Sequence, residues 1–168
     1  KSKKLYLKKL TKSDITTKYV NWLNDTNINK YLEARHFTHT LKSQRKYISE
    51  IINSKSTLIF GIFTNDNIHI GIIKIGPIDD INKFTEISYL IGDKNFLRKG
   101  YSYNSIKICE NFIFKKLKIL KISAGVYSNN IASIQLLKKL GYKKEFTKKK
   151  HLIFNDKRID VYVFSKFK

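Results

Sequence analysis

The sequence predicts an α/β domain with a mixed, mostly antiparallel sheet of about seven strands and helices on both faces. Two observations lead to this fold class. Runs of β-branched residues with turn residues between them alternate with segments whose apolar residues recur every three or four positions. The elements follow the order β-α-α-β-β-β-α-β-α-β-β, so a single β-α-β crossover, which sets two strands parallel, interrupts an antiparallel layout.

The first third of the chain is expected to hold one strand and three helical segments. Lys3 to Leu10 reads as the strand. The Ser13-Asp14 pair offers an N-cap for apolar residues at helical spacing, and a second short apolar set continues this pattern to Glu33. The polar stretch from Ala34 to Lys42 is expected to be a loop, and Ser43 is expected to cap the next helix.

In the middle of the chain the residue pattern becomes typical of β-strands. Thr57 to Thr64 and Ile68 to Gly76 are β-branched runs joined by Asn65-Asp66-Asn67, which predicts a hairpin. Phe84 to Gly92 is a third strand of this group. The later elements are a helix from about Gly100 to Lys116, a strand from Ile119 to Val126, a helix from Asn130 to Leu140 with Gly141 as its C-cap, and strands near Tyr142 to Phe154 and Arg158 to Phe167 around a turn at Asn155-Asp156.

Length and composition indicate one globular domain over residues 1–168. The 168 residues are 42% hydrophobic and 13% aromatic, which is enough to build a core. No run approaches the roughly 20 apolar residues of a membrane span, so no membrane partner is expected. The single cysteine, Cys109, permits no internal disulfide and fits a reducing cytoplasm.

The charge is unusual, because 34 lysines and arginines face 13 acidic residues, a formal net charge of +21. Such a protein attracts polyanions. Only four of the basic residues are arginines, although arginine is preferred for bidentate contacts to phosphates and bases. We therefore interpret most of the charge as compositional background, and a specific nucleic-acid partner is not expected.

The turn before the long helix is the most informative segment. Gly100 and Ser102 are small residues that open the helix, so successive backbone N–H groups can point at an anion, and Arg98 and Lys99 add positive charge beside them. The segment matches neither the Walker motif nor the Gly-x-Gly-x-x-Gly motif. Taken alone, it could equally be an ordinary strand-to-helix turn.

A second pattern follows thirty residues later, with Asn130, Ser133, Lys139, Gly141 and Tyr142 spaced as Asn-x-x-Ser…Lys-x-Gly-Tyr. Together with the run from Arg98 to Ser105, it resembles the GNAT superfamily of acetyl-CoA-dependent N-acetyltransferases. Within it the chain is similar to the branch of ribosomal-protein alanine acetyltransferases and bacterial amino-sugar acetyltransferases. The resemblance covers nearly the whole chain, including Trp22-Leu23-Asn24-Asp25 and Tyr31-Leu32-Glu33. Leu97 and Ser102 depart from the family's [Gln/Arg]-x-x-Gly-x-[Gly/Ala] motif.

The resemblance implies a GNAT fold that is splayed between the fourth and fifth strands, with acetyl-CoA as co-substrate. The pyrophosphate of acetyl-CoA would lie on the amides of the turn, its pantetheine arm would pair with the backbone of the fourth strand, and the Asn130 side chain would hold the arm near the thiol. The implied cofactor-binding residues are Leu90, Ile91, Leu97, Arg98, Lys99, Gly100, Tyr101, Ser102 and Asn130.

The implied reaction is direct attack of a neutral primary amine on the thioester, with backbone N–H groups polarising the carbonyl. Glu86 is the best-placed base, although it could instead be a strand carboxylate paired with a lysine. Leu137 occupies the position where many members carry a tyrosine acid. Ser133 is therefore the expected acid, unless it is only a small packing residue; Tyr89 and Tyr127 are weaker candidates.

The acceptor is the least determined part of the prediction. Arg35 and His36 lie in a loop expected to border its pocket, and the two histidines there, His36 and His39, have no third ligand, so no metal is expected. A positive protein repels polyamines, so a nucleotide-linked amino sugar is the preferred acceptor. A protein N-terminus is the alternative; a non-catalytic CoA-binding domain or a basic nucleic-acid-binding domain is less favoured. A homodimer is compatible with the sequence.

Overall fold

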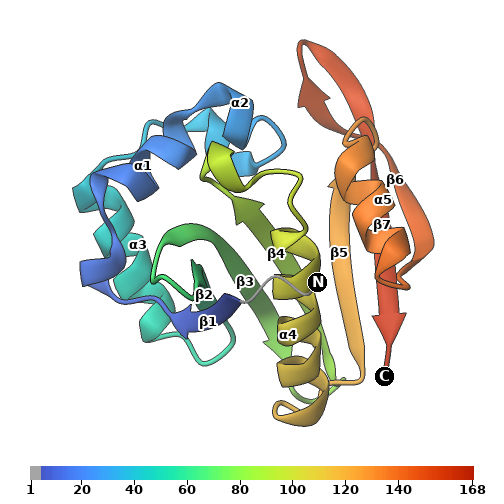
Figure 1. Ribbon diagram of the computed structural model, residues 1–168. Helices are drawn as coiled ribbons and strands as arrows, with labels where there is room; N and C mark the ends of the chain where they lie inside the picture. The colour runs from blue at the N-terminus through green and yellow to red at the C-terminus, as the bar shows by residue number, and fades with distance from the viewer. Residues whose placement is uncertain (1–4) are drawn as a thin grey trace.

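The computed structural model describes residues 5–168 and contains a seven-stranded sheet with helices on both faces (Figure 1). The strand order is β1-β2-β3-β4-β5-β7-β6, and only β4 and β5 run parallel. This confirms the predicted fold class; Lys3 and Lys4 of the first predicted strand lie outside the described residues. The elements are β1 (Leu5–Lys9), η1 (Lys12–Asp14), α1 (Thr17–Asn24), α2 (Thr26–Asn29), η2 (Glu33–His36), α3 (Leu41–Ile52), β2 (Leu58–Thr64), β3 (His69–Asp79), β4 (Phe84–Ile91), η3 (Lys94–Phe96), α4 (Tyr101–Lys115), β5 (Lys121–Tyr127), α5 (Ile131–Lys139), β6 (Lys143–Phe154) and β7 (Lys157–Phe167).

The two faces of the sheet carry separate cores. Along β4, Ile87 and Ile91 pack with α4 and α5, whereas Leu90 packs with α1 and α3. Successive strand residues point to opposite faces, so Glu86 and Ser88 share the α1–α3 face with Leu90, and Tyr89 shares the α4–α5 face. Both faces of the central strands therefore carry apolar residues that pack under helices, although Glu86 and Ser88 interrupt the α1–α3 face.

The sheet splits where β4 and β5 diverge, toward the top of Figure 1. They pair only from Phe84 to Glu86 on β4 and from Lys121 to Ser123 on β5. Beyond that point β4 continues beside β3 to Ile91, while β5 continues beside β7 to Tyr127. The expected splay between the fourth and fifth strands is thus confirmed, and it leaves two strand edges facing each other.

Two predicted helix starts are wrong by a few residues. Thr16, and not the Ser13-Asp14 pair, caps α1 by accepting a 3.3 Å hydrogen bond from the backbone N–H of Tyr19. Asp14 instead closes the short turn η1 by accepting from the backbone N–H of Thr11. Thr40, and not Ser43, caps α3, which begins at Leu41 inside the predicted loop from 34 to 42, and the helical turn η2 includes the first residues of that loop, up to His36.

Candidate functional site

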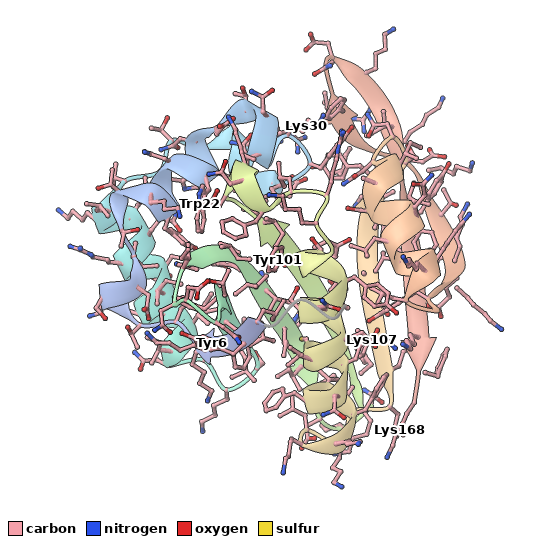
Figure 2. All side chains as sticks on the ribbon, in the orientation of Figure 1. Tyr6, Trp22, Lys30, Tyr101, Lys107 and Lys168 are labelled. Atoms are coloured by element: carbon pink, nitrogen blue, oxygen red, sulfur yellow. The ribbon has the colours of Figure 1, made fainter. Side chains whose placement is uncertain are left out.

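A cleft of about 1290 Å³ opens where β4 and β5 diverge. Its walls come from β4, β5, the first turns of α4 and α5, and the segment between α1 and α3. Figure 2 shows Tyr101 at the start of α4 and Lys30 near the segment that follows α2, and both residues line the cleft. The open strand edges thus lie inside a space that a small molecule could occupy.

One end of the cleft is the N-terminus of α4. Gly100 occupies the N-cap position with φ of 82°, a left-handed conformation that glycine adopts at little cost, and it has no side chain with which to cap the helix. Backbone N–H groups in a helix's first turn have no partner within the helix, and the helix dipole adds positive potential. This end of the cleft is therefore suited to bind a phosphate.

The structure brings most of the predicted cofactor residues to the cleft. Lys99 is the exception, because it does not line this space although its neighbours do. The open edge of β4 between Ile87 and Ile91 is free to pair with an extended chain such as a pantetheine arm, so the residues fit acetyl-CoA. The predicted residues that line the cleft are Leu90, Ile91, Leu97, Arg98, Gly100, Tyr101, Ser102 and Asn130.

The first turn of α5 contributes Asn130 and Ser133. Asn130 caps the helix, since its Oδ1 accepts a 3.3 Å hydrogen bond from the backbone N–H of Ser133. Both residues line the cleft. Leu137, one turn further along, is fully buried in the core, so the position at which the family often has a tyrosine offers no proton donor.

Tyr89 reaches the same region from β4. Its hydroxyl is buried and has no hydrogen-bond partner within residues 5–168. Burial raises the pKa of Tyr89, and the interaction with Ser133 partly offsets that rise. Tyr89 therefore stays a protonated phenol at neutral pH.

Glu86 stands at the closed end of the splay, since it is the last β4 residue paired with β5. Its side chain is exposed, and it is not part of the cleft lining, although Ile87 and Ser88 next to it are. No ion pair joins Glu86 to a lysine in the described part of the chain. Glu86 is therefore not the lysine-paired strand carboxylate that the sequence left as the alternative. Its role as a base stays a prediction.

Where Glu33 and Tyr127 line the cleft, η2 contacts the ends of β5 and β6. Arg35 donates from Nη1 to the Leu32 carbonyl at 3.0 Å and to the Tyr127 hydroxyl, and from Nη2 to the Ile153 carbonyl at 2.9 Å. The Tyr127 hydroxyl in turn donates to Glu33. Burial and the bond to Glu33 raise the pKa of Tyr127 to about 12. We call these contacts the Arg35 clasp.

The predicted substrate residues, Arg35 and His36, are next to residues that line the cleft but are not part of its lining, and their role at the acceptor stays a prediction. Arg35 is committed to the clasp, and His36 is exposed with its Nε2 3.9 Å from Glu33 Oε2; neither lines the cleft. Their neighbours Glu33 and His39 do line it. The aromatic rings of Tyr31, Tyr127 and Phe154 pack together beside the clasp, with Tyr31 stacked on Phe154 at 5.5 Å between centroids.

The charges along the cleft are mostly positive. Glu33 is its one lining carboxylate within the described residues, against the cations Lys30, Lys74, Arg98 and Lys139. Lys74 and Glu33 were not predicted as cleft residues, because a lysine within an apolar strand and a glutamate after a short helix carry no local signal in the sequence. Lys74 shares the α1–α3 face with Ile72 and lies opposite Ser88.

Residues 5–168 contain neither a metal-binding cluster nor a membrane-spanning helix. No group of three or more His, Cys, Asp or Glu side chains is arranged there to hold a metal ion. None of the helices in that range is long and apolar enough to cross a membrane.

Comparison with known sequences gives consistent results. Residues 4–143 match the family model described as "Acetyltransferase (GNAT) domain". The uncharacterised N-acetyltransferase p20 of Bacillus licheniformis is 28% identical over 172 residues, covering 99% of this chain and 94% of the relative. The probable N-acetyltransferase YjcK of Bacillus subtilis (strain 168) is 30% identical over 122 residues, covering 70% of this chain and 67% of the relative.

Comparison with solved structures shows the same fold. A spermidine N-acetyltransferase from Vibrio cholerae, in complex with CoA and spermine, superposes with a TM-score of 0.90 at 20% identity, covering 98% of this chain and 95% of that chain. A probable acetyltransferase superposes with a TM-score of 0.88 at 18% identity, covering 99% and 94%. At these identities the likeness concerns the fold.

Proposed function

This chain belongs to the GNAT acetyltransferase family, and we propose that it transfers the acetyl group of acetyl-CoA to a primary amine inside the cleft between β4 and β5. Members of the family are acyltransferases, and acetyl-CoA is their co-substrate. The observation that carries the proposal is the continuous cleft that joins the N-terminus of α4, the open edge of β4 and the first turn of α5.

Each part of the cleft has a role in this proposal. The backbone amides of residues 98–102 bind the pyrophosphate, and the edge at Leu90 and Ile91 pairs with the pantetheine arm. Asn130 and Ser133 meet the thiol end. Glu86 takes the proton of the acceptor's ammonium group through water, since the carboxylate lies just outside the cleft lining. The reaction is then direct attack of the neutral amine on the thioester.

Thermal unfolding with and without acetyl-CoA tests the cofactor part of the proposal. A ligand that binds only the folded state at 100 times its Kd stabilises it by about 2.7 kcal/mol, so a clear rise in Tm is expected. Desulfo-CoA, which keeps the pyrophosphate and pantetheine, should also stabilise the protein. An unchanged Tm at millimolar concentrations of both compounds would contradict the proposal.

The proposed acceptor is an amine carried by a neutral or anionic molecule, and a nucleotide-linked amino sugar is the preferred example. Support comes from the cleft's charges, in which Lys30 and Lys74 outnumber the lining carboxylate, Glu33. The Glu33 carboxylate also accepts a hydrogen bond from Tyr127. A polycation such as spermidine, named for the Vibrio cholerae enzyme, would meet repulsion from these lysines and from the net charge of +21.

A protein N-terminus is the second acceptor consistent with this cleft. The exposed apolar side chains of Phe37 and Ile131, both of which line the cleft, could contact the residues that follow a peptide's terminal amine. Such an acceptor would also avoid the repulsion that a polyamine meets. The two acceptors differ in the phosphates that only the nucleotide-linked sugar carries.

A further inference from the structure

A buried glutamine and a histidine form a hydrogen-bonded pair in the wall of the cleft. Gln44 lies near the start of α3 and His39 lies just before that helix, and both residues line the cleft. Nε2 of Gln44 is 2.8 Å from Nδ1 of His39, and Nε2 of His39 is 2.8 Å from the carbonyl oxygen of Ala34. Gln44 is only 7% exposed, so both ends of its amide need hydrogen-bond partners.

The Ala34 carbonyl decides which end of the Gln44 amide remains for a ligand. A carbonyl oxygen only accepts, so Nε2 of His39 carries the hydrogen of this bond. In the neutral ring Nδ1 is then an acceptor, and the NH2 group of Gln44 donates to it. The other end of the amide, Oε1, accepts no hydrogen bond within residues 5–168. This arrangement therefore leaves one amide oxygen as an unused acceptor in the cleft wall.

His39 is itself held in place from several sides. Its backbone N–H donates to Oδ1 of Asn24 at 2.8 Å, and its backbone carbonyl accepts from Nδ2 of Asn24 at 2.9 Å. Both ring nitrogens are also hydrogen-bonded. Asn24 is the last residue of α1, so contacts with two helices, α1 and α3, determine where the ring points. A binding group fixed in this way loses little entropy when a ligand arrives.

The amino group of the acceptor is the ligand whose chemistry suits this oxygen. Attack needs a neutral amine whose lone pair is directed at the thioester carbon, and a hydrogen bond from one amine N–H to a fixed oxygen orients that lone pair. An amide oxygen does this without a negative charge, whereas a carboxylate would favour the unreactive ammonium form. α3 covers the face of the sheet on which Glu86, the proposed base, also lies.

We propose that Gln44 binds the amino group of the acceptor through Oε1, and that His39 is the positioning residue that keeps this oxygen available to the cleft. This inference rests on the proposed transfer of acetyl to a primary amine. A purely structural role accounts for the NH2 group of Gln44 but leaves its oxygen without a partner, and a buried polar atom in that state costs about 1–3 kcal/mol. The role is the same for a sugar and for a peptide acceptor, because both carry the amine.

Calorimetry with unreactive acceptor analogues, on protein saturated with desulfo-CoA, tests the contact itself. The first pair of probes is the nucleoside-diphosphate sugar with a hydroxyl or a hydrogen in place of its amine. The second pair is the short peptide with the same two replacements at its terminal amine. One hydrogen bond separates the members of a pair, so the wild-type protein should prefer the hydroxyl compound about 3- to 10-fold.

Gln44→Met keeps the length of the side chain and should abolish this preference. A preference that survives in Gln44→Met, or one that is absent from the wild-type protein, would overturn the proposal. Binding of neither pair by protein that still binds desulfo-CoA would also overturn it. Lost binding of desulfo-CoA by the wild-type protein would instead contradict the proposed function itself.

Steady-state kinetics with the amine acceptors test the positioning role. Gln44→Met should lower kcat/KM for the acceptor about 10-fold or more and leave KM for acetyl-CoA nearly unchanged. His39→Phe removes the group that accepts from the Gln44 amide, so the amide can turn, and a smaller loss in the same parameter is expected. His39→Asn should recover most of that loss, because the asparagine Oδ1 lies close to where Nδ1 was. Equal losses in His39→Phe and His39→Asn would contradict the positioning role.

Gln135→Met is the matched control, because Gln135 is exposed on α5 and does not line the cleft. It should keep the wild-type kinetics and the wild-type preference for the hydroxyl probe. Binding of desulfo-CoA reports whether each variant is folded. If Gln44→Met does not fold, the same probes are compared on His39→Phe, in which the preference should weaken; an unchanged preference there would count against the proposal.

Discussion

Glu86 is the residue on which the proposed chemistry depends most. Its carboxylate is exposed on the α1–α3 face at the last paired position of β4, and no lysine within residues 5–168 neutralises it. Glu86→Gln removes the base without changing the size of the side chain. We expect kcat/KM to fall by about 100-fold or more, in line with general-base catalysis.

The control for this variant is Glu50→Gln, because Glu50 is an exposed carboxylate on α3 that does not line the cleft. Steady-state kinetics between pH 6 and 9 would compare the two. If Glu86→Gln keeps the wild-type rate and pH profile, another group takes the ammonium proton.

Gly100 is the residue whose backbone sets the phosphate-binding turn. Its φ of 82° strains any side chain, although a Cβ there would meet open space. Gly100→Ala should therefore lower the free energy of unfolding by about 1 kcal/mol and weaken acetyl-CoA binding. Gly125→Ala is the control for stability in urea unfolding, since an added Cβ at 125 meets its nearest neighbour, Val161, at an ordinary 3.6 Å and φ is not positive. Equal stability of the two variants would argue against backbone strain at residue 100.

His69 makes the protein's stability depend on pH. Its Nε2 donates to the Gly71 carbonyl at 3.0 Å and its ring stacks on Phe63 at 4.5 Å, and burial lowers the pKa of His69 to about 4. The unfolded chain takes up a proton below about pH 6.5, whereas the folded chain does so only near pH 4. The contribution of neutral His69 to the free energy of unfolding is therefore complete above pH 6.5. About 3 kcal/mol of it is lost as the pH falls from 6.5 toward 4.

Urea unfolding at pH 7, 6, 5 and 4.5 measures this effect. His69→Phe keeps a ring in the stack and should flatten the loss of stability over the window. His151→Phe, at an exposed position on β6, controls for the removal of an imidazole. A His69→Phe curve parallel to wild type would show that other groups cause the pH dependence.

At the scale of elements, the Arg35 clasp holds η2 against β5 and the end of β6. One guanidinium bonds to carbonyls of Leu32 and Ile153 and to the hydroxyl of Tyr127, which a lysine cannot do. Arg35→Lys should therefore loosen this end of the cleft, raise KM for the acceptor several-fold and leave KM for acetyl-CoA nearly unchanged. A rise in KM for both substrates, measured by bisubstrate kinetics, would contradict a local role.

The order of elements could be predicted from the sequence, whereas several helix starts could not. Ser, Thr and Asp are all good caps, and the segment from 11 to 16 contains four such residues. Tertiary packing decides among them: Ile15 is fully buried, so the chain must turn inward before α1 can begin at Thr17. The start of α5 was predicted to within one residue, since the helix expected from Asn130 begins at Ile131 with Asn130 as its N-cap.

At the scale of the whole molecule, the turn before α4 could be predicted from the sequence, whereas the contacts around Arg35 could not. The turn before α4 is local, so Gly100 and its neighbours carried their own signal. The Arg35 clasp joins residues 92 and 118 positions apart, and no local pattern could bring Tyr127 and Ile153 to Arg35. Arg35 and His36 were therefore predicted from a segment that borders the cleft, while Glu33 and Lys74 in the lining were missed.

The central claim is that the chain acetylates an amine on a neutral or anionic acceptor. Measuring the release of free thiol with a panel of amines tests this claim most directly. The panel needs a nucleoside-diphosphate amino sugar, a short peptide with a free N-terminus and spermidine, each at matched ionic strength. Lys74→Glu would reverse one charge in the cleft, and Lys46→Glu would make the same change on the exposed surface of α3. We expect the amino sugar to be the best acceptor, and Lys74→Glu, but not Lys46→Glu, to reduce its kcat/KM about 10-fold or more. Turnover of spermidine in preference to the sugar and the peptide would contradict this account of the cleft.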